Sequence, residues 1–214
     1  MRIRFLRHGE TEWNRERRLQ GATEWTRLTD FGVRLAEMTR DGMRRAGLAF
    51  DRVYTSPYLR ARQTAEIVAE GFGLEPIVDR RLCEMAFGAH EGTFIEDGRF
   101  ADENIRACFR DPERYVARDG AESFEEVADR LRDFLERELR PLETSCRSVL
   151  VVTHGGAMRT IRRLLADVPL ADYWKGRQPN CCVHEVELAD GAFTLAAEAR
   201  VFYDQELAAS VPSV

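Results

Sequence analysis

The sequence predicts an α/β fold with a mostly parallel central sheet that is covered by helices on both faces. Three segments share one pattern, in which a short apolar strand leads through a polar corner into an amphipathic helix: IRFLRHGE, DRVYTSPYLRARQTAEIVAEGFG and SVLVVTHGGAMRTIRRLLADV. Strands that alternate with helices are typical of parallel β-α-β units. Residues 149–153 are apolar at nearly every position, as expected of a strand that is covered on both faces.

Two helices are predicted from the residues at their start. Ser56 is a good capping residue, and Pro57 then occupies the first helical position, which proline favours. Arg60 therefore falls in the first turn of that helix. The second helix has the most regular apolar face in the chain, and it begins with a capping box formed by Ser123 and Glu126.

Two later segments depart from the repeated pattern. Residues 181–202 alternate between apolar and polar side chains about an Asp190-Gly191 turn, so we expect a β-hairpin, and its His184 is interpreted as structural. Residues 93–119 are polar, weakly patterned and long for a connection, which favours an insertion or lid.

Length and composition restrict the classes of function. At 214 residues the chain is expected to form one domain over residues 1–214, and it contains no apolar stretch of about 20 residues that could span a membrane. The net charge of −5 argues against broad nucleic-acid binding. The odd number of cysteines, without a C-x-x-C pair or an export signal, favours reduced thiols over disulfides or structural zinc. We therefore expect a cytoplasmic protein that binds neither nucleic acid nor membranes.

Three polar residues fall where the repeated pattern places the ends of strands. His8 and His154 each follow an apolar run directly, and Arg60 comes just after the end of the second strand. In β-α-β units the corners after parallel strands lie at the same edge of the sheet, where ligands bind. If these strands are neighbours, we expect the three side chains to converge.

These residue types suit transfer of a phosphoryl group. A neutral histidine nitrogen is a nucleophile that can attack phosphorus in line, and Gly9 after His8 is expected to let the substrate approach the backbone closely. The guanidinium groups of Arg7 and Arg60 can bind phosphate oxygens in pairs and keep their charge at all ordinary pH values. The edge of the sheet is therefore predicted to be a phosphate site.

Five motifs in this order resemble the histidine phosphatase superfamily, in its phosphoglycerate-mutase-like branch: RHGETEWN, SPYLRARQTAE, LCEMAFGAHEG, AESFEEVADRL and VVTHGGAMR. The resemblance covers nearly the whole chain. It implies that His8 becomes phosphorylated and that Glu84 is the proton donor. It also implies that the phosphate is bound by Arg7, Arg60 and His154 and that the first loop lines the pocket with Asn14 and Gln20.

The resemblance further implies a three-layer α/β/α sandwich of the phosphoglycerate-mutase-like kind, and no metal or cofactor. The expected activity is that of a histidine acid phosphatase-type phosphomonoesterase. The expected partner is a small phosphorylated metabolite, and the chain is expected to be able to form a homodimer.

Two alternatives to a phosphatase are a cofactor-dependent phosphoglycerate mutase and a non-catalytic sensor of phosphorylated ligands. Family mutases carry Arg-His-Tyr-Gly after the acid to hold a carboxylated substrate, whereas Met85 and Ala86 provide no cation here. Unless Arg27 or an arginine of the insertion reaches the pocket, a phosphatase is favoured. The arginines of the insertion are separated from one another: Arg106, Arg110 and Arg114. A sensor needs neither a nucleophile nor an acid.

Overall fold

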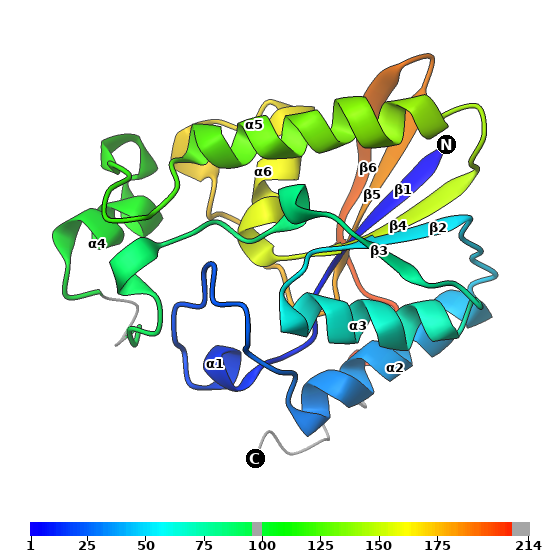
Figure 1. Ribbon diagram of the computed structural model, residues 1–214, viewed down its shortest axis with the longest axis horizontal. Coiled ribbons are helices and arrows are strands. Elements are labelled where there is room, and N and C mark those ends of the chain that lie inside the picture. The colour runs from blue at the N-terminus through cyan, green and yellow to red at the C-terminus, as the bar shows by residue number, and fades with distance from the viewer. Residues whose placement is uncertain (96–99, 207–214) are drawn as a thin grey trace.

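The computed structural model describes residues 1–95 and 100–206, and within them a six-stranded sheet forms the centre of the molecule (Figure 1). The strands are β1 (Arg2–Arg7), β2 (Arg52–Thr55), β3 (Pro76–Val78), β4 (Ser148–Thr153), β5 (Val183–Ala189) and β6 (Ala192–Arg200). The α-helices are α1 (Glu12–Arg15), α2 (Asp30–Arg45), α3 (Leu59–Glu70), α4 (Glu103–Arg110), α5 (Phe124–Phe134) and α6 (Gly155–Ala166). A π-helical turn, Leu135–Leu139, continues α5. Short 3-10 helices span Arg80–Leu82, Gly88–His90, Pro112–Arg114, Arg140–Leu142 and Leu170–Asp172.

The strand order is β3-β2-β4-β1-β5-β6, and the first four of these strands are parallel. The hairpin of β5 and β6 joins the sheet antiparallel to β1. Arg7 is paired with Thr153, so His8 and His154 follow neighbouring strands at the same edge. The prediction of a mostly parallel sheet is confirmed, and β2, β4 and β1 are neighbours, which is the condition for the three side chains to converge.

Helices cover both faces of the sheet, with α5 and α6 on one side and α2 and α3 on the other (Figure 1). Alternate residues of β4 divide between the two cores: Val151 packs with α5 and α6, and Leu150 packs with α2 and α3. All residues from 149 to 153 are fully buried, which explains the continuous apolar run. The architecture is the three-layer α/β/α sandwich that the sequence predicts.

Helix α3 begins two residues later than predicted. Its N-cap is Tyr58, and Leu59 is the first helical residue. The Ser56 hydroxyl accepts a hydrogen bond from the Tyr58 N–H at 3.3 Å and lies 2.8 Å from Nε2 of His154. The Ser56 hydroxyl therefore contacts His154, which follows β4, and Ser56 is not the N-cap of α3. The prediction that Ser56 caps the helix is wrong. Arg60 nevertheless stays in the first turn.

The other two local predictions are confirmed. The capping box at the start of α5 is present, with Ser123 and Glu126 exchanging hydrogen bonds. The β5–β6 hairpin turns at Asp190 and Gly191, which have φ angles of 52° and 74°. Positive φ at both central residues is typical of the tight turn that Asp-Gly favours.

The segment 93–119 contains regular structure that its weak pattern did not predict. It includes α4 and the 3-10 helix Pro112–Arg114, whereas residues 96–99 lie outside the described part. Phe109 of α4 stacks near Trp174, with 4.5 Å between ring centroids, and the Trp174 indole donates to the Cys108 carbonyl at 2.6 Å. The segment thus packs against the loop before β5. No helix among the described residues combines the length and apolar character needed to cross a membrane.

Candidate active site

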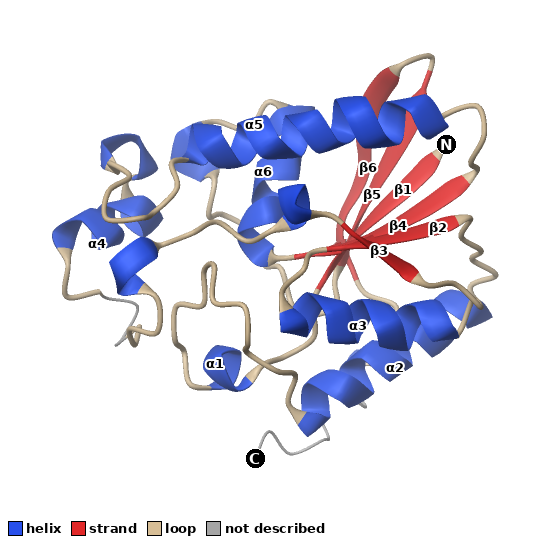
Figure 2. Cartoon of the chain, in the orientation of Figure 1, coloured by secondary structure: helices blue, strands red, loops and turns tan. Residues whose placement is uncertain are grey.

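A pocket opens at the carboxyl edge of the sheet, on the side where α1 and α4 lie (Figure 2). Its volume is about 200 Å³, which is below the range typical of drug-sized ligands and suits a small ligand. Of the residues predicted for the site, the following line the pocket: Arg7, His8, Asn14, Gln20, Arg60 and Glu84. The seventh, His154, is fully buried beside His8, with 5.2 Å between the two ring centroids. The structure therefore brings together every residue that was predicted.

His8 is held as a neutral imidazole with its proton on Nδ1. Its Nδ1 lies 2.7 Å from the carbonyl oxygen of Gly9, an acceptor that requires a proton on Nδ1. Complete burial, with a smaller contribution from the nearby Arg60 and Arg7, lowers the pKa of His8 well below its usual value. Nε2 therefore keeps a lone pair at neutral pH, as a nucleophile requires.

The glycine after His8 serves a different purpose from the one predicted. A Cβ on Gly9 would lie 2.7 Å from the carbonyl oxygen of Gly32, so the close approach is made by the first turn of α2. The Gly9 N–H donates to the Thr64 hydroxyl of α3 at 3.0 Å. Gly9 thus fixes the corner that carries His8, and the expectation that it makes room for substrate is corrected.

Arg60 is fully buried, and its guanidinium group holds the first loop of the pocket. It donates to the carbonyl oxygens of Thr23 at 2.6 Å and Gly21 at 2.8 Å, and to the Thr26 hydroxyl at 3.0 Å. Burial lowers its pKa to about 10, so the group remains charged at neutral pH. These contacts use the terminal nitrogens, and Nε is buried without a hydrogen-bond partner among the described residues.

Arg7 is arranged in a similar way at the end of β1. One terminal nitrogen donates to the carbonyl oxygen of Gln178, whereas Nε is buried with no partner within residues 1–95 and 100–206. The backbone of the loop before β5 therefore anchors this arginine and leaves one donor unused. A second unused donor thus belongs to a residue that lines the same pocket as Arg60.

Nε2 of His154 contacts the Ser56 hydroxyl. The Ser56 oxygen accepts from the Tyr58 N–H at 3.3 Å and lies 2.8 Å from Nε2 of His154, and a hydroxyl can either donate to that nitrogen or accept from it. Burial, together with Arg60, lowers the pKa of His154 well below its usual value and keeps the ring neutral. Nδ1 of His154 is also buried, and it has no hydrogen-bond partner in the described structure.

The Glu84 carboxylate is held at the N-terminus of α6. Its oxygens accept from the N–H groups of Gly156 at 3.0 Å and Ala157 at 3.1 Å, and from the Met85 N–H at 2.9 Å. The first N–H groups of a helix have no partner within the helix, so the carboxylate satisfies them. This contact requires a glycine, because a Cβ on Gly156 would lie 2.5 Å from Oε1 of Glu84.

Arg130 of α5 fixes the segment that carries Glu84. It donates to the carbonyl oxygens of Arg81 at 2.8 Å and Cys83 at 2.7 Å. Its other nitrogens bind the Glu122 carboxylate, which also accepts from the Ala86 N–H. Glu84 is thus supported on both sides of its position in the chain.

Asn14 and Gln20 line the pocket, and the protein engages the amide oxygen of each. The amide oxygen of Asn14 accepts from the Thr11 backbone and from the Asn180 side chain, at 3.2 and 3.3 Å. The amide oxygen of Gln20 accepts from the Thr11 hydroxyl at 2.9 Å. In both residues the oxygen is engaged by the protein, so the nitrogen is the group available to a ligand.

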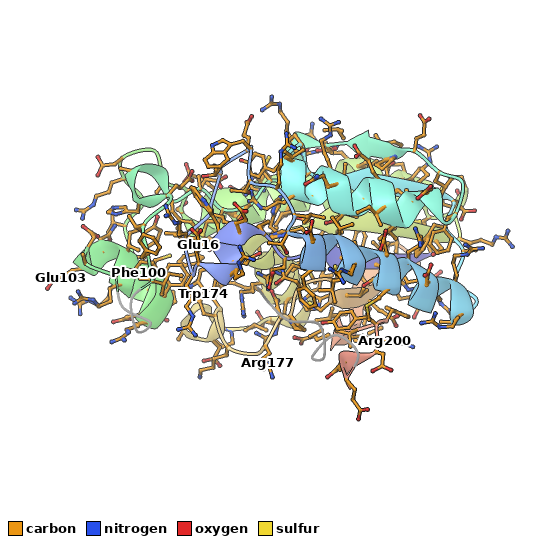
Figure 3. All side chains as sticks on the ribbon, turned by 90° about the horizontal axis from the view of Figure 1, so that it is seen from below. Glu16, Phe100, Glu103, Trp174, Arg177 and Arg200 are labelled. Atoms are coloured by element: carbon orange, nitrogen blue, oxygen red, sulfur yellow. The ribbon has the colours of Figure 1, made fainter. Side chains whose placement is uncertain are left out.

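Several pocket residues were not predicted from the sequence: Arg18, Leu19, Phe87, Phe109, Arg159, Trp174 and Gln178. Arg159 falls within the last quoted motif, four residues after Gly155, so helical spacing alone could have placed it on the same face of α6. Trp174 lies toward the end of the molecule that carries Phe100 and Glu103 (Figure 3). No local pattern marks it, because its neighbours Cys108 and Phe109 are distant in sequence.

Comparison with known proteins places this pocket in a family. A model of the histidine phosphatase superfamily (branch 1) matches residues 3–199. The chain is 33% identical over 187 residues to a probable phosphoglycerate mutase GpmB of Serratia proteamaculans, covering 87% of this chain and 85% of that protein. It is 27% identical over 207 residues to a putative phosphoserine phosphatase 2 of Hydrogenobacter thermophilus, covering 96% and 98%.

The fold agrees with these matches. The solved structure of Bacillus stearothermophilus YhfR superposes with a TM-score of 0.83 at 31% identity, over 94% of this chain and 97% of that one. A family model that spans most of the chain, a relative above 30% identity and a shared architecture all agree with the five motifs. The chain therefore belongs to the histidine phosphatase superfamily, branch 1.

Proposed function

We propose that the protein is a metal-independent phosphomonoester hydrolase that acts on a small phosphorylated metabolite through a phosphohistidine at His8. The observation that carries the proposal is the set of buried donors around that imidazole. Nε of Arg7, Nε of Arg60 and Nδ1 of His154 are each buried with no hydrogen-bond partner among the described residues. A buried polar group without a partner is costly, so these groups call for a ligand, and the proposal takes His154 in the tautomer that carries its proton on Nδ1. A phosphoryl group has three equatorial oxygens to accept from them.

The proposed reaction has two steps. Nε2 of His8 attacks phosphorus while the bond to the leaving oxygen breaks, and that oxygen takes a proton from Glu84. Water then attacks the phosphohistidine and gives its proton to Glu84, which releases phosphate and restores both residues. The positive charge of Arg7 and Arg60 stabilises the oxygens in both steps.

The part of the pocket beyond the phosphate site supports hydrolysis over mutase activity. Its wall includes Leu19, Phe87, Phe109 and Trp174. Met85, which follows the acid, is fully buried in the core. Among the described residues, Arg27 and the arginines of the insertion do not line the pocket.

The two other arginines of the wall are held by the protein. Arg159 donates to the carbonyl oxygens of Lys175 at 2.9 Å and Gly176 at 3.0 Å, and Arg18 lies 2.7 Å from the Glu16 carboxylate. A mutase must retain a carboxylated product for a second transfer. The Glu16 carboxylate offsets the charge of Arg18, and both terminal nitrogens of Arg159 already donate to carbonyl oxygens, whereas Arg7 and Arg60 each keep a buried Nε without a partner among the described residues. We therefore expect product release before the second transfer.

The test compares phosphate release with isomerisation. We expect release of inorganic phosphate from p-nitrophenyl phosphate and from at least one member of a panel of phosphorylated metabolites. We expect little interconversion of 3- and 2-phosphoglycerate, even with the bisphosphate cofactor present. The His8→Ala variant serves as the control for contaminating phosphatase. Efficient interconversion with negligible phosphate release would favour the mutase, and tight binding without any turnover would favour the sensor.

A further inference from the structure

In the loop before β5, a glutamine side chain lies against a buried histidine. Nε2 of the Gln178 amide lies 3.1 Å from Nε2 of His184, and His184 is fully buried on β5. Nδ1 of His184 lies 3.0 Å from the backbone nitrogen of Ala199 on β6. Gln178 also lines the pocket, and its backbone carbonyl accepts from Arg7.

The hydrogen bond from Ala199 determines the tautomer of His184. A backbone N–H can only donate, so Nδ1 of His184 carries no proton. Burial lowers the pKa of His184 to about 4, so at neutral pH the ring carries one proton, on Nε2. That Nε2–H is a donor and requires an acceptor, which the amide nitrogen of Gln178 cannot be.

The amide oxygen and nitrogen of a glutamine are nearly identical in shape, and hydrogen bonding decides between them. In the orientation with the nitrogen toward His184, the oxygen Oε1 is buried and has no partner among the described residues. Rotating the amide by half a turn gives the His184 proton an acceptor. The same rotation places the NH2 group where Oε1 lay. The Nε2–H of His184 then has an acceptor, and the amide oxygen of Gln178 has a donor.

The position that the NH2 group then takes is next to the unused donor of Arg7. A Cβ on Gly155 would lie 3.5 Å from Nε of Arg7 and 3.9 Å from Oε1 of Gln178, so both atoms approach the same point above the first residue of α6. Two N–H donors beside a helix N-terminus favour an anion between them. An NH2 group facing a guanidinium group with nothing between them gains no hydrogen bond.

We propose that the side-chain amide of Gln178 donates to an oxygen of the substrate phosphoryl group, and that His184 is the positioning residue that directs this amide into the pocket. The proposal rests on the proposed function, because it takes the pocket to be a phosphate site. Gln178 is then a ligand of the same oxyanion as Arg7, supplied by the hairpin side of the sheet.

The first test measures binding of inorganic phosphate by calorimetry, without turnover. Gln178→Met keeps the length of the side chain and removes its donor, and the exposed Gln205→Met is the matched control. We expect Gln178→Met to bind phosphate about 10- to 100-fold more weakly than wild type, since a hydrogen bond to a charged acceptor is lost. We expect Gln205→Met to bind phosphate as wild type does.

The outcomes separate the two proposals. Wild type that fails to bind phosphate overturns the phosphate site and this inference with it. Wild type that binds phosphate, with Gln178→Met within about threefold of it, overturns only the role of Gln178. Thermal unfolding of Gln178→Met shows whether a loss of binding reflects a loss of fold.

The second test needs no variant that might fold poorly. Nitrogen-15 NMR of the wild-type protein at neutral pH reports which ring nitrogen of His184 is protonated and whether the Gln178 side-chain NH2 resonances shift on titration with phosphate. We expect the Nε2–H tautomer and a saturable shift of the Gln178 amide. A proton on Nδ1 of His184, or a Gln178 amide that does not respond at saturating phosphate, would overturn the proposal.

Discussion

Replacing Gly156 by alanine is expected to displace the Glu84 carboxylate and to impair protonation of the leaving group. The added Cβ would lie 2.5 Å from Oε1, whereas ordinary contacts begin near 3.4 Å, so the oxygen must retreat by about 0.9 Å. A displacement of about 1 Å in a reacting group can cost about 100-fold in rate. Alanine is favoured over glycine within a helix by up to about 1 kcal/mol, so we expect no large loss of stability.

The assay compares substrates that depend differently on an acid. An alkyl phosphate has a poor leaving group that requires a proton, whereas p-nitrophenyl phosphate has a leaving group that departs readily without one. We expect Gly156→Ala to reduce kcat on the alkyl phosphate by about 100-fold and to reduce it far less on p-nitrophenyl phosphate. Glu84→Gln is the reference, because its carboxamide keeps the shape of the carboxyl group and removes the acid. Equal losses of Glu84→Gln on both substrates would refute the assignment of Glu84 as the acid, and full activity of Gly156→Ala on both would refute the displacement of its carboxylate.

Three further predictions follow from the pocket. Excess chelator should leave phosphatase activity unchanged, because Arg7 and Arg60 supply the positive charge, and a loss that magnesium or zinc restores would contradict this. Arg60→Lys should reduce kcat strongly and lower the melting temperature, because an ammonium group cannot bind the loop carbonyls and also donate to phosphate; wild-type values for both would argue against these roles. Because the pKa of His184 is about 4 in the folded protein and about 6.5 when unfolded, the unfolded chain binds more protons between these values. The free energy of unfolding should therefore fall as the pH drops from 6.5 to 4, and this residue should contribute about 3 kcal/mol to the fall. Urea titrations at several pH values should show a shallower fall for His184→Phe than for wild type. The same dependence on pH in both proteins would contradict this.

The residues at the ends of the strands could be predicted because their signals are local. An apolar run ending in His8 or His154 marks both the strand and its edge, and parallel topology then brings the edges together. The register of β1 against β4 is what turns these local signals into one site. For Glu84 the residues give no such signal, since it lies in an irregular segment, and only the resemblance to a family predicted it.

The remaining features depend on contacts between distant segments. Ser56 is a plausible helix cap from local sequence, but its hydroxyl contacts His154, which is 98 residues away. Likewise, nothing near Gln178 in sequence predicts that it reaches both Arg7 and the pocket. Tertiary contacts of this kind override local preference, which is why the predicted start of α3 was wrong and the aromatic residues of the pocket were not predicted.

The central claim is that a phosphohistidine forms at His8, and rapid quenching with radiolabelled substrate tests it most directly. Wild type quenched during turnover should carry phosphate that is labile in acid and stable in base, and peptide mapping should locate it at His8. The His8→Ala variant should carry no phosphate, and its melting temperature should be close to that of wild type. Label that persists on folded His8→Ala, or a wild-type label that is stable in acid, would contradict the phosphohistidine mechanism.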